Sequence, residues 1–307
     1  EMITKKLCFA LAASALLACG LVAQAITIET VVVGNPGNAA QPTAQLGAVA
    51  YEYEIGKFEV TIGQYVAFLN AVAATDTYGL ASVAGGLVTQ SGSSGSYTYA
   101  AATNPDRPIA GISWAKAARF ANWMHNGQPT GAQALGTTED GSYYLNGAND
   151  APSLIAVTRA AGATWVIPTI NEWYKAAHYS PANSAYYFYA YMDNVATTTK
   201  ANYAGSVGSS TVVGSYAFPS EYGTYDQSGN VHEWTEEVAS SDNRILMGGQ
   251  FNWDATWMQG WNGQNLSQNV TQGYPPHGFR LALVPEPATL AFIALGTVGL
   301  LIRRRGQ

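Results

Sequence analysis

Cysteine is almost missing from this 307-residue chain, because its two cysteines, Cys8 and Cys19, both lie near the start. Beyond position 19 the chain therefore has no disulfide, no thiolate metal ligand and no sulfur nucleophile. Charge is also scarce: the four charged residue types make up 11% of the chain, against about 25% in an average domain. With 32 glycines and 19 tyrosines, this composition favours a loop-rich α+β fold with small sheets and few helices over a helical bundle.

The first 25 residues have the pattern of a secretory signal peptide. Two lysines precede an apolar stretch from Leu7 to Val22, and the small-x-small sequence Ala-Gln-Ala follows, ending at Ala25. Such a leader is removed on export, so we expect cleavage after Ala25. Lipoprotein-type cleavage at Cys19 is the alternative, although Leu17 fits that pattern poorly.

The last 24 residues, 284–307, combine three features. The tripeptide Pro285-Glu286-Pro287 precedes an apolar segment, and Arg303-Arg304-Arg305 follows it. The 15 residues from Ala288 to Ile302 are short against the roughly 20 of a stable membrane span. Lys and Arg resist translocation, so the basic cluster is expected to stay on the cytoplasmic side.

This tail resembles a PEP-CTERM sorting signal. The resemblance implies an exosortase-type processing protease as partner, in a Gram-negative bacterium. It also implies a transient tether to the inner membrane, followed by release to the cell surface or extracellular matrix. An ordinary C-terminal anchor is the alternative.

The segment between the two ends is acidic. Setting aside the leader and the terminal arginines leaves 9 basic and 19 acidic residues between Ile26 and Pro287, a net charge of about −10. Nucleic acids and anionic lipids require a basic face, so neither is an expected partner. Residues 26–283 are enough for one domain with its own core.

Apolar periodicity and capping residues predict about three helices. They run from Thr61 to Ala73, from Ser113 to His125, and from Thr169, which forms a capping box with Glu172, to Tyr179. Strands are expected at 51–60, 141–147, 186–191, 245–247 and 279–283, with an extended loop or hairpin at 75–104 and a long loop at 194–223.

Six sequence blocks resemble, in order, those of the sulfatase-modifying-factor or formylglycine-generating-enzyme-like family. They are Phe58–Leu69, Arg107–Trp114, Ile167–Ala177, Gly223–Thr235, Arg244–Gly249 and Gly278–Arg280. The resemblance implies a single, irregular α+β domain related to the C-type-lectin-like fold.

Several residues of these blocks have a structural interpretation. We expect Trp114, Trp173 and Trp234 in the core, because large aromatic rings dominate burial. Gly229 is expected at positive φ. Arg280 is expected to pair with a buried carboxylate, either Glu172 or Glu233.

The resemblance also implies calcium in the loop that begins at Asp226. The ligands carried over by position are the side chains of Asp226 and Glu233 and the carbonyls of Gly229 and Val231, and calcium prefers such oxygens. A second, weaker site maps onto Asn202 and the carbonyl of Tyr203, without its downstream Asp. The alternative is that Asp226 caps a turn and Glu233 bonds Arg280.

The enzymes of this family bind copper through two cysteines that precede the Gly-Phe-Arg block. The interval 250–277 contains none, so we expect neither copper nor formylglycine formation. A metal-dependent enzyme of the non-haem iron type is the alternative function. Such a site needs two histidines and a carboxylate, and the four histidines, at positions 125, 178, 232 and 277, show no motif spacing.

The same interval is rich in tryptophan. Trp253, Trp257 and Trp261, with Asn262, supply rings that stack on sugars and an amide that bonds hydroxyls. The prediction is an exported surface or matrix protein that uses this region to bind a glycan or a surface protein. The alternative is that two of the three rings belong to the core.

Overall fold

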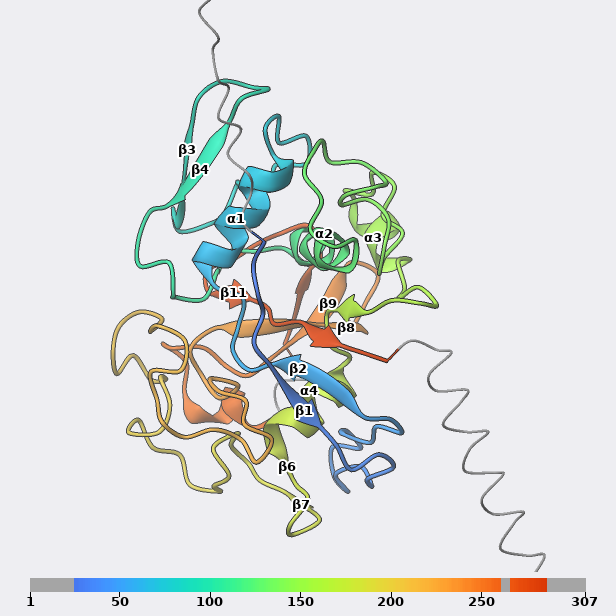
Figure 1. The fold of residues 1–307 in the computed structure, drawn as a ribbon. Coiled ribbons are helices and arrows are strands. Elements are labelled where there is room, and N and C mark those ends of the chain that lie inside the picture. The colour runs from blue at the N-terminus through green and yellow to red at the C-terminus, as the bar shows by residue number, and fades with distance from the viewer. Residues whose placement is uncertain (1–24, 261–265, 286–307) are drawn as a thin grey trace, which may run out of the picture.

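A computed structural model describes residues 25–260 and 266–285 (Figure 1). One four-stranded antiparallel sheet has the order β1-β2-β12-β5, with bounds Thr30–Val33, Tyr53–Gly56, Ala282–Leu283 and Trp165–Val166. Ala282 pairs with Ile55 on one side and with Val166 on the other. The last strand of the described chain is therefore a central strand of its sheet.

A second four-stranded sheet has the order β10-β9-β8-β11. The strands are Ser267–Asn269, Asn243–Met247, His232–Val238 and His277–Gly278. The pairing of β8 with β11 is parallel and places His277 opposite His232. Two hairpins complete the strands: β3 and β4 (Val88–Ser91 and Thr98–Ala101), and β6 and β7 (Tyr179–Ser180 and Ala185–Tyr186).

The three predicted helices are confirmed, each with its predicted cap. They are α1 (Ile62–Val72), α2 (Trp114–His125) and α4 (Ile170–His178), preceded by the N-caps Thr61, Ser113 and Thr169. The capping box of Thr169 and Glu172 is present. Two short helices were not predicted, α3 (Ala151–Ile155) and the 3₁₀ helix η1 (Ala255–Met258), because each is too short to show a periodic apolar stripe.

Two strand predictions are wrong. Residues 141–147 form bends and a turn with one isolated bridge, Tyr143 to Arg159, and the side chain of Asn122 bonds both backbone groups of Tyr143. In the interval 186–191 only the first residue is in a strand, and Tyr189 pairs with Asp193 across a tight turn. Dense tyrosines imitate a strand pattern, but here Tyr189 and Tyr191 stack on each other at 5.4 Å between centroids.

The remaining predictions hold in part or in full. The strand predicted at 51–60 is limited to β2, and the one at 279–283 to β12. The strand at 245–247 lies within β9, the hairpin within 75–104 is β3–β4, and the stretch 194–223 contains no helix or strand.

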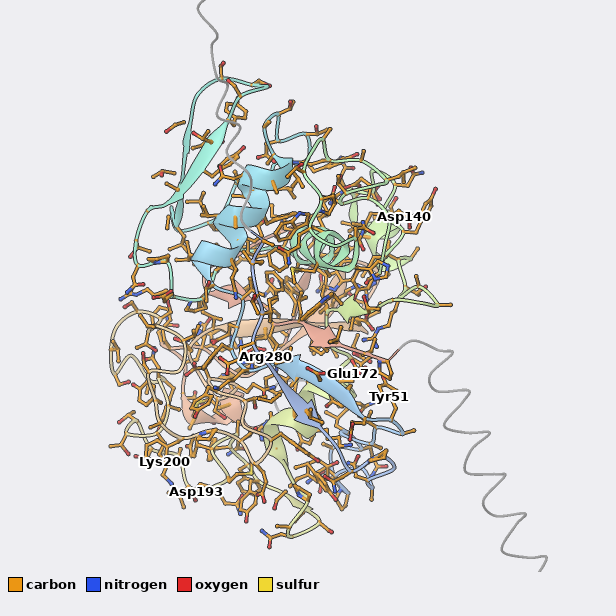
Figure 2. The ribbon with its side chains drawn as sticks, viewed as in Figure 1. Tyr51, Asp140, Glu172, Asp193, Lys200 and Arg280 are labelled. Carbon is orange, nitrogen blue, oxygen red and sulfur yellow. The ribbon has the colours of Figure 1, made fainter. Side chains whose placement is uncertain are left out.

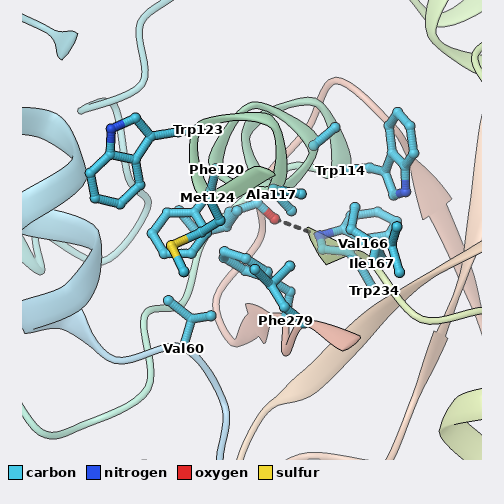
Figure 3. Packing of buried hydrophobic residues seen from close by; sticks show 14 of the residues in the cluster. Val60, Trp114, Ala117, Phe120, Trp123, Met124, Val166, Ile167, Trp234 and Phe279 are labelled. Atoms are coloured by element: carbon cyan, nitrogen blue, oxygen red, sulfur yellow. Dashed lines mark hydrogen bonds between the residues drawn. The ribbon is translucent and has the colours of Figure 1, made fainter. Parts of the chain in front are cut away.

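The core lies between α1, α2 and the two sheets (Figure 3). Trp114, Trp173 and Trp234 are completely buried, as predicted. The Trp234 indole donates a hydrogen bond to the carbonyl of Ile112 at 2.7 Å, which satisfies its only polar group. Among the described residues, no helix has the length and apolar composition needed to cross a membrane.

Candidate functional site

Arg280 pairs with Glu233, the second of the two partners left open by the sequence. The guanidinium donates two hydrogen bonds to the carboxylate, at 2.5 and 2.6 Å, and neither side chain is exposed to solvent. The Trp173 indole donates a third, at 2.7 Å. The Glu233 carboxylate at the start of β8 is therefore held by α4 and by the segment before β12.

Glu172 is engaged elsewhere, beside Tyr51 (Figure 2). Arg159 donates to both of its oxygens at 2.9 Å, and the backbone N–H of Thr169 donates at 2.7 Å. Burial opposes its ionisation, but the hydrogen bonds and the charge of Arg159 outweigh burial and lower the pKa of Glu172.

Two more buried carboxyls, those of Glu59 and Asp226, lie close enough to the Arg280–Glu233 pair to interact with its charges. Burial, together with the charges of Asp226 and Glu233, raises the pKa of Glu59 well above its usual value. Burial raises the pKa of Asp226 to about 6, even though the Gly214 N–H donates to it at 2.6 Å. Three carboxyls thus lie around one guanidinium, and burial together with the neighbouring negative charges favours the protonated form of Glu59.

The predicted calcium ligands fit unequally. Both oxygens of Glu233 are taken by Arg280 and Trp173, so this carboxylate does not fit a calcium ion in the observed geometry. Asp226 bonds the Gly214 N–H with one oxygen, as a turn-capping residue does. In the ranges 25–260 and 266–285, no three His, Cys, Asp or Glu side chains are placed so that they could hold one metal ion together.

The second predicted site has one suitable oxygen. The Asn202 side chain donates to the carbonyl of Ser209 at 2.9 Å, but its buried oxygen has no hydrogen-bond partner. One oxygen of Glu59 is likewise buried and unpartnered. Such atoms are rare in native structures, so Asn202 fits an oxygen-binding cation better than Glu233 does.

Gly229 takes the positive φ expected of it, 91°. A Cβ at this position would lie 2.2 Å from the carbonyl oxygen of Asn202. The Asn230 N–H donates to that same carbonyl at 2.9 Å. The loop from Asp226 to Val231 therefore packs backbone against backbone on the segment around Asn202.

The two described tryptophans of the predicted ligand-binding region form a half-buried pair. Trp253 and Trp257 have ring centroids 4.8 Å apart and pack against the core. The alternative that two of the three rings belong to the core therefore holds in part, because both side chains are partly buried against it. Trp261 and Asn262 lie outside the described residues.

His232 contacts one ring of the tryptophan pair, Trp253. Its ring centroid is 4.8 Å from that of Trp253 and 5.8 Å from that of His277. Burial lowers the pKa of both histidines, that of His277 to about 4. No spacing motif predicts this pair, because β8 and β11 bring together residues 45 positions apart. Glu59 was also missed; its signal is a lone carboxylate in an apolar stretch.

At the two ends of the described chain, Ala25 is exposed and Pro285 is half-buried. The Val284 N–H donates to the Thr164 carbonyl at 2.9 Å, which extends the pairing of β12 by one residue. Glu286 and Pro287 of the predicted sorting motif lie outside the described residues.

Comparison with solved structures supports the fold. Treponema denticola variable protein 1 is 19% identical, with a TM-score of 0.56, over 85% of this chain and 98% of that one. CarF is 21% identical, with a TM-score of 0.59, over 84% and 99%. These similarities confirm an irregular, loop-rich α+β domain. A comparison with curated proteins finds no match.

Comparison with family models identifies both parts of the chain. Residues 283–305 match the PEP-CTERM protein-sorting motif, which indicates export and processing by an exosortase-type system. Residues 21–284 match the sulfatase-modifying factor enzyme 1-like domain. The chain therefore belongs to the sulfatase-modifying factor enzyme 1-like family and carries a PEP-CTERM sorting motif.

Proposed function

We propose that this protein is an exported, non-catalytic binding protein of the cell surface or extracellular matrix, which holds a glycan or a surface protein against Trp253 and Trp257. The observation that carries the proposal is the half-buried tryptophan pair, 4.8 Å between centroids, supported from behind by the core. Rings fixed on one side lose little entropy on stacking with a sugar face.

Export and release follow from the sorting motif within this proposal. An exosortase-type protease would process the inner-membrane-tethered protein, and the domain would then reach the surface or matrix. The absence of cysteine in the interval 250–277 supports a non-catalytic role, because the copper chemistry of the related oxidases needs paired thiolates.

Binding of the full chain to the exopolysaccharide of the producing cells tests the proposal. We expect Trp257→Ala to weaken binding about five- to thirtyfold, because loss of one stacking ring costs about 1–2 kcal/mol. Tyr144→Ala is the matched control, since Tyr144 is an aromatic residue with 59% exposure outside this region. Equal binding by wild type and Trp257→Ala would remove the proposed site.

Calcium is part of the proposal as a stabiliser of the loops around Asn202 and Asp226. The unpartnered oxygen of Asn202 supports it, whereas Glu233 does not. A calcium concentration 100 times the dissociation constant would stabilise the domain by about 2.7 kcal/mol. Thermal unfolding in calcium, in magnesium and in EDTA measures this difference, and Asn202→Ala should reduce it.

A further inference from the structure

His232 and His277 have polar atoms that no other part of the described chain satisfies. Both ring nitrogens of His232 and Nδ1 of His277 are buried without a hydrogen-bond partner. The carbonyl of Met247 approaches His232 closely enough to affect its pKa, but not in hydrogen-bonding geometry. An unpaired buried polar atom costs about 1–3 kcal/mol, so three of them in one place indicate a missing partner.

The spacing of the two rings suits a shared metal ion. Zn–N bonds of about 2.0–2.1 Å place each imidazole centroid roughly 3.2 Å from the ion, so two ligating rings have centroids about 5–6.4 Å apart. The observed separation is 5.8 Å, with the rings inclined at 65°. The parallel register of β8 and β11 fixes this arrangement, because it places the two residues directly opposite each other.

The surroundings favour a cation held by neutral nitrogen ligands. Trp253 contacts His232, while Trp234 and Tyr274 contact His277, all with ring centroids within 6.0 Å. Aromatic faces attract cations, and the acidic chain as a whole lowers the cost of bringing one in. The other two histidines are engaged elsewhere: His125 bonds Thr164, and His178 bonds the Tyr187 carbonyl.

We propose that His232 and His277 together bind one divalent ion of the zinc class. Imidazole suits zinc, and an ion with two protein ligands keeps open positions for water or for a group of a bound molecule. No His, Cys, Asp or Glu from the ranges 25–260 and 266–285 completes a group of three at this place. The site therefore differs from the thiolate copper site of the related oxidases and from the predicted calcium loops.

Zinc titration by calorimetry tests this site in the full chain, with Cys8 and Cys19 replaced by serine so that leader thiols do not compete. We expect one zinc per chain. His232→Phe and His277→Phe should each weaken binding at least tenfold, whereas His125→Gln should leave it unchanged. The two phenylalanine variants should also unfold at the same or a higher temperature without zinc, because they remove unpaired nitrogens.

A purely structural role for the pair predicts the opposite, namely lower stability of the phenylalanine variants and zinc binding that is absent or unaffected by them. Electron paramagnetic resonance of the Cu²⁺-substituted wild type gives a readout that needs no variant. Hyperfine coupling to two imidazole nitrogens supports the site. Coupling to one nitrogen, or to none, overturns it, as does the lack of saturable zinc binding.

Discussion

Replacing Arg280 by methionine is expected to be one of the most damaging single changes in the domain. The substitution would leave the buried Glu233 carboxylate with only the Trp173 indole as donor. It would also remove hydrogen bonds of 2.9 Å to the carbonyls of Gly56 and Tyr225. Breaking a buried ion pair from one side costs about 3–5 kcal/mol, and orphaned carbonyls add to that cost. We expect a loss of about 5 kcal/mol.

The double variant Glu233→Gln/Arg280→Met separates the pair from the rest of the network. A neutral amide costs less to leave unpaired than a carboxylate, so the double variant should be less destabilised than the sum of the two single variants, by at least about 2 kcal/mol. Urea unfolding followed by fluorescence measures all four free energies. Lys57→Met is the control: its pair with Glu29 lies at the surface, so we expect a far smaller loss than for Arg280→Met.

Repeating this double-variant cycle with and without calcium distinguishes the two roles considered for Glu233, as the partner of Arg280 or as a calcium ligand. If Glu233 acts only as the partner of Arg280, the coupling free energy between the two residues is the same in EDTA and in calcium. A coupling that appears only in calcium, or an Arg280→Met variant that loses less than about 1 kcal/mol, would refute the reasoning.

Two further predictions concern the backbone and the response to acid. Gly229→Ala should lower the free energy of unfolding in urea by at least about 3 kcal/mol more than Gly205→Ala does. Both glycines have positive φ, but only Gly229 lacks room for a Cβ. Equal losses would contradict the close contact with Asn202. Burial lowers the pKa of His178 to about 3, while its Nδ1 bonds the Tyr187 carbonyl. The unfolded chain thus binds more protons between pH 3 and 6.5, so stability falls as the pH falls through this range, by on the order of 4 kcal/mol. His178→Gln should flatten that dependence in thermal unfolding scans.

Local signals predicted the elements whose boundaries are set by local chemistry. The caps Thr61, Ser113 and Thr169 each satisfy backbone N–H groups a few residues away, so a single sequence is enough to locate the three main helices. The strand predictions for 141–147 and 186–191 were wrong because backbone groups in these segments bond side chains that are distant in sequence, those of Asn122 and Ser228.

In the candidate site, too, features set by local sequence could be predicted and features set by distant contacts could not. The choice between Glu172 and Glu233 for Arg280 could not be made from the sequence, since α4 and β8 both lie within reach of the core. The His232–His277 pair depends on a parallel strand register that no local pattern encodes. In contrast, Gly229 was predictable, because a tight turn followed by a buried strand demands positive φ.

The place of β12 in its sheet determines how the domain responds to pulling. Both neighbours, β2 and β5, hold this strand by hydrogen bonds, and the match to the sorting motif begins at its last residue, Leu283. Tension transmitted from the far side of Val284 therefore acts along the strand, in shear, so that bonds on both flanks share the load. An edge strand would peel away one bond at a time, whereas this central strand can leave only when the bonds on both flanks break together.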